Sequence, residues 1–352
     1  MKNFSGSYKS EDVEFLVTQI DIEFTDIKTK EQNIRDGLHY SQMLSPEYEP
    51  SKDYLELFYS SLDNSKRRVA NDSLALAKYI SNKKDVILVS LLRAGTPIGV
   101  LVKRGLKEIF NQDVPHYSIS IIRDREIDNK ALNYIMNKHK NANIVFIDGW
   151  TGKGVIKAEL DKFVTLYNQK NSTNISSKLH VLADIAGKAD VSATNDDYFI
   201  PSSALNSTVS GLVSRSVLDK KYTNQDQFHG VKFYKEYKDS DLSQFFIDTI
   251  VEQMHLIEDI SDVIGKNISL AKETEEYIKV LQEKFNIKHI NHIKPGIAES
   301  ARVLLRRDPY LIIVKDINSP DITHIKQLAM EKNIKIEEDK SLPYSVVGII
   351  KE

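Results

Sequence analysis

The chain has 352 residues, a length that suggests two or three domains, each able to bury a hydrophobic core. Its 48 Lys and Arg residues nearly balance its 50 Asp and Glu residues, so no net field draws it to nucleic acids or membranes. It contains no cysteine, which excludes disulfides, cysteine-ligated zinc and a cysteine nucleophile. Neither a signal-peptide core nor an apolar run of membrane-spanning length is evident, so we expect a cytoplasmic protein.

The first sixty residues are polar and mixed, and the Ser45-Pro46 pair interrupts regular structure within them. We interpret residues 1–60 as an extension that packs on the domain that follows. Beyond it, Val69 and Leu74 belong to an apolar stripe that predicts a helix over 62–81.

From residue 85 onward, short apolar runs alternate with longer amphipathic segments. The run Asp85-Val-Ile-Leu-Val-Ser-Leu-Leu92 is rich in β-branched residues, which is typical of a central strand buried on both faces of a parallel sheet. Strands separated by helices indicate βαβ units, so we predict an α/β domain with a doubly wound parallel sheet over 61–240. The expected strands are 85–92, 116–122, 142–147 and 179–183, and the expected helices are 98–110 and 154–167.

Two further regions follow this domain. Residues 241–285 contain two amphipathic patterns, which we interpret as a helical connector. Residues 286–352 begin a new, small α/β unit, with strands expected at 310–314 and 345–350.

The most informative segment surrounds Asp148. A buried strand is expected to end there, and residues 151–154 (Thr-Gly-Lys-Gly) lead directly into a helix. Backbone N–H groups, a hydroxyl and an ammonium at a helix N-terminus favour a bound anion, and glycines let a phosphate approach the backbone. Asp148, at the carboxyl end of its strand, would face the hydroxyls of a sugar attached to that phosphate. An ordinary tight turn is the plainer alternative, and the spacing of a Walker loop is absent.

Two other loops carry cations just beyond predicted strands. Arg93, Ala94 and Gly95 follow the first strand, and Arg123 and Arg125 follow the second. Guanidinium groups form paired hydrogen bonds with phosphate oxygens. The small-residue loops at 93–95 and 151–154 each follow a predicted strand of the same sheet, which suggests a ligand with two separated phosphate groups. For the second arginine pair, a solvated loop is an equally simple interpretation.

Together these segments resemble type I phosphoribosyltransferases. Ser90-Leu-Leu-Arg-Ala-Gly-Thr-Pro97 is similar to the family's pyrophosphate loop, Ile147-Asp-Gly-Trp-Thr-Gly-Lys-Gly154 to its PRPP loop, and Arg123-Asp-Arg125 falls where its mobile loop lies. The closer resemblance is to a bacterial subfamily encoded near tellurium-resistance and stress genes, through His39-Tyr-Ser41 and the long segment 200–215. Its members are sometimes labelled cysteine proteases, a chemistry that a chain without cysteine cannot perform.

The same subfamily carries a C-terminal Pelota-type RNA-binding domain with an L7Ae-like fold. Residues 286–352 resemble that domain through Lys294-Pro-Gly-Ile-Ala-Glu-Ser-Ala-Arg302 and Leu342-Pro-Tyr344. A glycine before a helix with several arginines can read RNA phosphates and base edges, although a solvated helix face is the alternative. The RNA contacts implied by the resemblance are Lys294, Gly296, Glu299, Arg302 and Arg306.

The resemblance implies that a base-like nitrogen nucleophile displaces pyrophosphate from C1 of PRPP, giving a nucleotide-like product in a stress response. Mg²⁺ would accompany PRPP, with Asp148 as its candidate protein ligand. The implied roles are the 5-phosphate for Thr151, Gly152, Lys153 and Gly154, the ribose for Asp148, the pyrophosphate for Arg93, Ala94 and Gly95, and closure over it for Arg123 and Arg125.

The acceptor pocket is expected in the polar segment that begins after residue 205. His229 is a lone histidine, and such a residue is more often structural than a ligand. Separately, a homodimer is expected only because the family commonly forms one. The acceptor candidates are Asn206, Ser207, Thr208, Ser210, Arg215, Phe228 and His229.

One departure from the family pattern leaves a second hypothesis open. The family usually has two adjacent acids in its PRPP loop, whereas here Asp148 stands alone before Gly149. The missing carboxylate favours a non-catalytic sensor of PRPP or a nucleotide that controls RNA binding. The retained Arg123 and Arg125 favour catalysis, and the intact Thr-Gly-Lys-Gly loop disfavours a pure RNA-binding scaffold.

Overall fold

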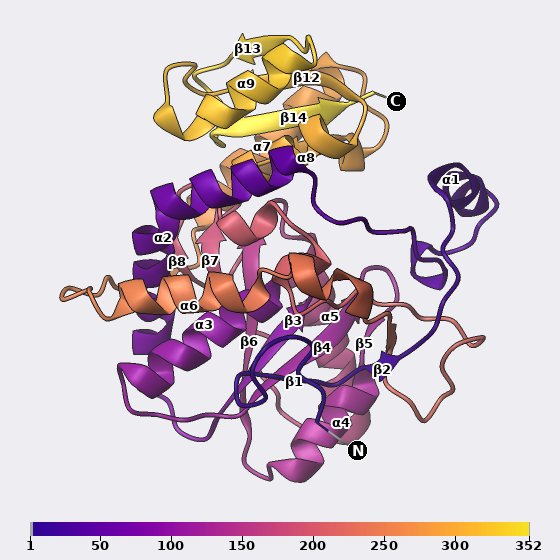
Figure 1. The fold of residues 1–352 in the computed structure, drawn as a ribbon, viewed down its shortest axis with the longest axis vertical. Coiled ribbons are helices and arrows are strands. Elements are labelled where there is room, and N and C mark those ends of the chain that lie inside the picture. Colours follow the sequence, from indigo (N-terminus) through magenta and orange to yellow (C-terminus); the bar gives the residue numbers. More distant parts are fainter. Residues whose placement is uncertain (1–2, 352) are drawn as a thin grey trace.

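A computed structural model describes residues 3–351 and shows a mixed α/β protein built around a mainly parallel sheet (Figure 1). The strands pair in the order β1-β4-β3-β6-β7-β8-β10, with β5 (Glu126–Ile127) attached to β4 as an antiparallel hairpin. In that order the strands are Glu14–Phe15, His116–Ile122, Val86–Leu92, Asn143–Thr151, Leu179–Asp184, Val191–Thr194 and Ile264–Gly265.

The central strands are buried on both faces, as their apolar runs predict. Every residue of β3, β4 and β7 is buried. Alternate side chains of β3 enter different cores: Val86 and Leu88 pack into one apolar cluster, and Ile87 and Val89 into another. The two clusters lie on opposite faces of the sheet, which confirms the expected layering of helices on both sides.

Each face of the sheet is covered by its own helices. The first core is shared with α2 (Lys52–Ser81), α3 (Gly95–Glu108) and α6 (Ser243–Met254). The second is shared with α4 (Asn129–Lys138) and α5 (Val155–Asn171).

Two element boundaries differ from the sequence-based expectation. Helix α2 begins at Lys52 rather than near residue 62, because Leu57 and Phe58 extend its buried face. Strand β6 continues to Thr151, where the expected strand stopped at 147, because its last residues still pair with β7. Asp148 therefore lies within a strand, and the loop is only Gly152-Lys153-Gly154.

The N-terminal sixty residues do more than pack on the sheet from outside. Strand β1 joins the main sheet beside β4, and β2 (Thr18–Gln19) pairs in parallel with β9 (Gly230–Val231). A short helix, α1 (Ile27–Arg35), precedes the single turn at Tyr40–Gln42. The predicted connector also contributes a strand, since β10 lies antiparallel to β8 between α6 and α7 (Ile268–Lys284).

The last part of the chain has a separate four-stranded sheet. We call residues 286–351 the C-terminal unit and the rest the main unit. The sheet order is β11-β14-β12-β13, and α8 (Ile297–Arg306) and α9 (Thr323–Glu331) pack together beside it. The strands in that order are Ile293–Pro295, Val346–Ile350, Pro309–Val314 and Ile336–Glu338.

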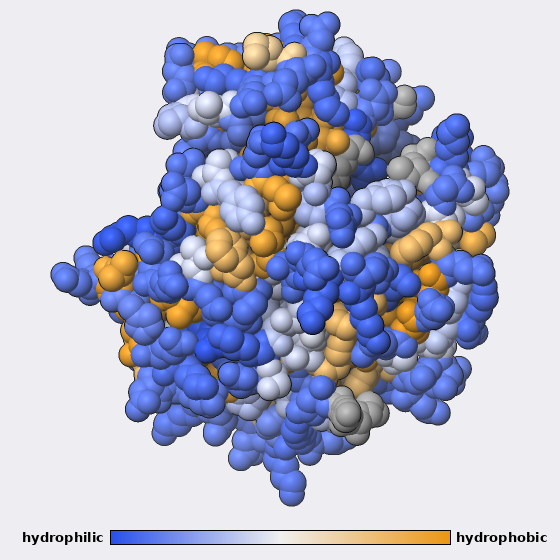
Figure 2. Space-filling view, in the orientation of Figure 1, coloured by the Kyte–Doolittle hydropathy of each residue, from blue (hydrophilic) through white to orange (hydrophobic). Residues whose placement is uncertain are grey.

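The C-terminal unit sits at one end of the molecule, drawn in yellow in Figure 1, and its core continues into the main unit. Ile293 and Ile297 belong to the same apolar cluster as Val69 and Ile185. The outer surface is different: Figure 2 shows a face made mostly of hydrophilic residues with scattered apolar patches. Among the described residues, no helix is both long enough and apolar enough to cross a membrane.

A buried carboxylate fastens the two units to each other. Asp197 of the main unit accepts hydrogen bonds from the backbone N–H groups of Ile297 (2.9 Å) and Ser345 (3.1 Å). The first of these caps the N-terminus of α8, where a negative group is favourable. Burial nevertheless raises the pKa of the Asp197 carboxyl to about 7, with these hydrogen bonds opposing the shift.

The raised pKa of Asp197 predicts how pH affects stability. The folded state holds this proton up to about pH 7, whereas an unfolded aspartate releases it near pH 4. The stability that Asp197 contributes should therefore fall as pH rises through this window, by up to about 1.4 kcal/mol per pH unit. We expect the free energy of unfolding of the natural chain to decline relative to that of Asp197→Asn between pH 5 and pH 8.

Urea denaturation followed by tryptophan fluorescence measures this difference. Asp196→Asn is the matched control, because that neighbouring side chain is exposed and forms an ion pair with Arg68. Parallel pH profiles for the natural chain and Asp197→Asn would show that the Asp197 carboxyl does not titrate in this range.

Candidate functional site

Three of the predicted site segments meet at the carboxyl edge of the main sheet. Strand β3 lies between β4 and β6 in parallel register, so the residues that follow these strands emerge on the same side. The contact is close at Gly95, where a Cβ atom would lie 2.5 Å from the carbonyl oxygen of Ile147 and 3.0 Å from the Cα atom of Asp148. Only glycine lets the loop after β3 approach β6 in this way.

Asp148 faces a cavity of about 250 Å³ at this edge. One carboxylate oxygen accepts a hydrogen bond from the Gly149 N–H at 2.8 Å. Burial raises the pKa of the Asp148 carboxyl to about 7, and that hydrogen bond opposes the shift. The cavity is lined by Asp148, Trp150, Thr151, Gly152, Lys153, Gly154, Val155, Ile156, Lys157, Leu179, Lys294, Pro295 and Glu299.

The loop at the floor of this cavity turns sharply into helix α5. Gly154 precedes the helix with φ of 77°, and a Cβ atom there would lie 2.5 Å from the Cγ atom of Lys188. Both the backbone conformation and the lack of space require glycine. The first residues of α5, from Val155 to Lys157, line the cavity. The first backbone N–H groups of a helix have no partners within it and favour an anion nearby.

Two side chains of the loop already have protein partners. The Thr151 hydroxyl donates a hydrogen bond to Asp184, a buried residue at the end of β7. The Lys153 ammonium donates to the carbonyl oxygens of Ile290 (2.8 Å) and Ile293 (3.0 Å) in the C-terminal unit. Burial, together with the charge of the nearby Lys294, lowers the pKa of Lys153 to about 8. The Thr151 hydroxyl proton is therefore already used within the protein.

Arg93 brings the predicted pyrophosphate loop to part of the predicted acceptor segment. Its guanidinium forms an ion pair with Glu47 at 2.6 Å and donates to the Asn206 side chain at 3.3 Å. Glu47 also accepts from the backbone N–H of Ser207 at 3.2 Å. Sequence reasoning missed Glu47, because nothing in its local segment signals contacts with residues so distant along the chain. Of the other acceptor candidates in this segment, Thr208 and Ser210 are buried.

A second cluster forms around Tyr40, which the sequence indicated only through the His39-Tyr-Ser41 resemblance. The Tyr40 hydroxyl accepts a hydrogen bond from the Arg123 backbone N–H at 3.1 Å. The ring centroid lies 6.0 Å from the Arg123 guanidinium and 5.5 Å from that of Arg215. Arg215 also donates to the Met43 carbonyl, but its buried Nη1 has no partner among the described residues. Arg125 is exposed at the tip of the hairpin.

The last two acceptor candidates have different surroundings. The His229 ring hydrogen-bonds to Ser120 at 2.8 Å and to Glu126 at 3.3 Å, and its backbone N–H donates to Asp128 at 2.6 Å. Phe228 packs edge-on against Tyr134. The structure therefore groups both residues with β4, β5 and α4, and it does not bring them to Arg93 and Asn206.

The residues assigned to RNA lie between the two units. Lys294 and Glu299 line the cavity beside Lys153. Gly296 is buried, and a Cβ atom there would lie 2.6 Å from Ile185. Arg302 forms an ion pair with Glu299 at 3.0 Å and donates to the Ser203 carbonyl at 3.0 Å, with its guanidinium 5.7 Å from the Trp150 ring centroid. The Arg306 side chain lies outside the described residues.

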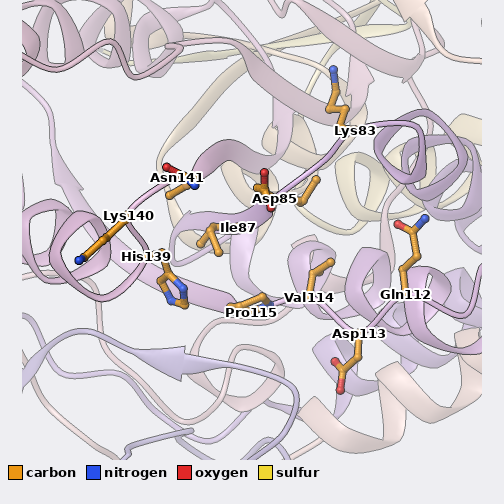
Figure 3. Close-up of a pocket in the computed structure, with 12 residues that line it drawn as sticks. Lys83, Asp85, Ile87, Gln112, Asp113, Val114, Pro115, His139, Lys140 and Asn141 are labelled. Carbon is orange, nitrogen blue, oxygen red and sulfur yellow. The ribbon is translucent and has the colours of Figure 1, made fainter.

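Within the part of the chain that the structure describes, neither a metal-binding cluster nor the other large cavity involves the predicted site residues. No group of three or more His, Asp or Glu side chains among the described residues could hold a metal ion by itself. A larger cavity of about 550 Å³ lies at the opposite edge, beside the amino ends of β3, β4 and β6 (Figure 3). Asp85, Asp113 and His139 line it, and it contains none of the predicted site residues.

The comparisons with known proteins identify the family. Residues 6–251 match the family described as tellurite-like stress resistance cysteine protease StiP, and residues 272–352 match the PELOTA RNA binding domain. A protein of Acinetobacter baylyi named cysteine protease StiP is 38% identical over 368 residues, covering 100% of this chain and 95% of its own length.

Similarity to solved structures is weak. A hypoxanthine phosphoribosyltransferase of Trypanosoma cruzi aligns over 39% of this chain and 82% of its own, with 13% identity and a TM-score of 0.27. A hypothetical protein from Neisseria gonorrhoeae with bound ppGpp covers 34% of this chain and 68% of its own, with 13% identity and a TM-score of 0.24. Similarity at this level establishes neither a shared fold nor a shared activity.

The family is described as cysteine proteases, yet this chain has no cysteine and cannot supply a catalytic thiolate. The match to the family nevertheless covers most of the chain, and the curated relative aligns from end to end. The chain therefore belongs to the StiP family.

Proposed function

We propose that the chain is a PRPP-dependent phosphoribosyltransferase that makes a nucleotide-like product in a stress response and binds RNA through its C-terminal unit. The observation that carries this proposal is the cavity shared by Asp148 and the Gly152-Lys153-Gly154 loop. It combines a carboxylate for sugar hydroxyls with a helix N-terminus and an ammonium for a phosphate.

The cationic clusters beside this cavity suit a second, more highly charged group. The Arg93 loop touches the backbone of Asp148, so a ligand that occupies the cavity can extend toward Arg93. Arg215 has a buried donor without a partner among the described residues, and its pKa is lowered by burial and by the charge of Arg93. An anion placed between these arginines would supply the missing acceptor and relieve their repulsion.

In the proposed reaction, the C1–oxygen bond to pyrophosphate breaks, a bond from C1 to the acceptor nitrogen forms, and the nitrogen releases a proton. Asp148 orients the ribose through its hydroxyls and, when ionised, stabilises the positive charge that develops on the sugar. The Arg93 guanidinium leaves its ion pair with Glu47 and binds the leaving pyrophosphate instead. Arg123 and Arg125, on the β4–β5 hairpin, exclude water when the hairpin closes.

Mg²⁺ fits this site as an ion carried mainly by the substrate. Asp148 and Glu299 are the carboxylates that line the cavity, and Glu299 is already paired with Arg302. Asp148 would hold the ion together with substrate oxygens and water, and the ion would neutralise charge on the pyrophosphate.

A sensor that binds PRPP or a nucleotide without turnover is the second candidate. It is favoured by the protein partners of Thr151 and Lys153, which leave fewer side-chain donors free than a dedicated phosphate loop would have. In that case the C-terminal unit would report ligand occupancy rather than assist catalysis.

Asp148→Asn tests the role of the carboxylate. The amide keeps the volume but removes the charge that stabilises the developing cation, so pyrophosphate release should fall by about 10²–10³-fold. The measurement is pyrophosphate release from PRPP and Mg²⁺ with a panel of bases and cell RNA as acceptors. Asp113→Asn, at the opposite edge of the sheet, should leave the rate unchanged.

Two results would count against the transferase. Equal rates for Asp148→Asn and the natural chain would remove Asp148 from the mechanism. Saturable PRPP binding without pyrophosphate release under any of these conditions would favour the sensor.

The pH dependence of kcat/KM provides an independent check. Asp148 is protonated below its pKa of about 7, and Lys153 loses its charge above its pKa of about 8. Both charges are needed, so kcat/KM should rise toward pH 7 and fall beyond pH 8, giving a bell-shaped profile. Asp148→Asn should flatten the acid limb, and Lys153→Met the alkaline limb. A profile whose limbs survive both substitutions would assign the titrations to other groups.

A further inference from the structure

The cavity at the carboxyl edge has walls from both units. Lys153 and Trp150 come from the main unit, whereas Lys294, Pro295 and Glu299 come from β11 and α8 of the C-terminal unit. Pro295 lies next to the loop, since a Cβ atom on Gly152 would be in van der Waals contact with its carbonyl oxygen at 3.7 Å. The C-terminal unit thus closes the cavity over the loop that the main unit provides.

Positive charge dominates where the two units meet. Lys294 and Lys153 face the same cavity, and each is partly desolvated. The Lys294 ammonium has no hydrogen-bond partner among the described residues. Glu299 is the nearby counter-charge, but it is shared with Arg302 at 3.0 Å. Lys153 and Lys294 thus line one cavity whose carboxylates are Glu299, already paired with Arg302, and Asp148, whose pKa is raised by burial. This balance leaves room for an anion.

Lys294 and Arg302 are also residues with which the C-terminal unit is expected to bind RNA. The charges of Arg307 and Arg302 both lower the pKa of Lys294, so these two arginines lie near Lys294 in a domain of the RNA-binding type. Phosphate contacts from lysine and arginine supply most of the affinity of such domains. The Arg302 guanidinium lies over Trp150, at the same cavity. An RNA phosphate that binds these cations therefore reaches the place where a small phosphate ligand would sit.

We propose that Lys294 belongs to the phosphate-binding site, so that the two units jointly bind one phosphate group, taken either from a small phosphate ester or from RNA. The proposal rests on the proposed function for the identity of the small ligand but not for the binding itself. Because the two ligands share Lys294, each weakens the binding of the other by the same factor. RNA then controls access to the cavity without any contact with Asp148.

The test uses the full chain and ribose 5-phosphate, which carries the phosphate and the sugar but no pyrophosphate. Trp150 is the only tryptophan in the sequence and lines the cavity, so its fluorescence reports occupancy directly. Lys294→Met should raise the Kd for ribose 5-phosphate by about tenfold or more, the loss expected for one charged hydrogen bond. Lys294→Arg should recover most of the affinity, and Lys332→Met, on the exposed end of α9, should match the natural chain.

A second titration distinguishes the two phosphate sources. Saturating single-stranded RNA should raise the Kd for ribose 5-phosphate in the natural chain, and this competition should disappear in Lys294→Met. Unchanged affinity in Lys294→Met, or no binding by the natural chain at millimolar concentrations, would overturn the shared site. Independent binding of RNA and ribose 5-phosphate would overturn the competition. Ribose 5-phosphate binding without pyrophosphate release from PRPP would instead retain this site and reject the transferase.

Discussion

The parallel pairing of β3 with β4 on one side and β6 on the other is the constraint on which the candidate site depends. It brings three loops from distant parts of the sequence to one edge of the sheet, where Arg93, Arg123 and Asp148 become neighbours. The contact of Gly95 with β6 shows how closely the register must be kept, because a one-residue slip would replace glycine by a side chain.

The extension of β6 to Thr151 determines how the second unit is attached. Because the strand continues past Asp148, the Gly152-Lys153-Gly154 loop projects beyond the sheet and reaches β11. Lys153 and Asp197 then connect opposite sides of the contact, one through its ammonium and the other through its carboxylate. The loop that we propose to bind an anion therefore also holds the C-terminal unit in place.

The sequence was sufficient for features that depend on local patterns. Buried strands such as β3 and β4 have continuous apolar runs, and Gly154 stands at a turn that only glycine can make. Contacts between distant segments have no such signature. Glu47 pairs with Arg93 and Tyr40 supports Arg123, although each lies in a polar stretch that resembles ordinary loop. The end of β6 was also misplaced, since pairing with β7 decides it rather than hydrophobicity. The roles assigned to the site residues remain predictions.

The apolar core that runs from Val69 through Ile185 to Ile297 has a practical consequence. In many modular proteins the linker separates two parts that can be produced singly, but here a cut before the C-terminal unit would divide a continuous core. Each fragment would expose apolar side chains that are now buried, and the polar groups around Asp197 would lose their hydrogen-bond partners. Both changes favour aggregation of the fragments. A substitution on one side of this contact should therefore be tolerated only when the residues on the other side can accommodate it.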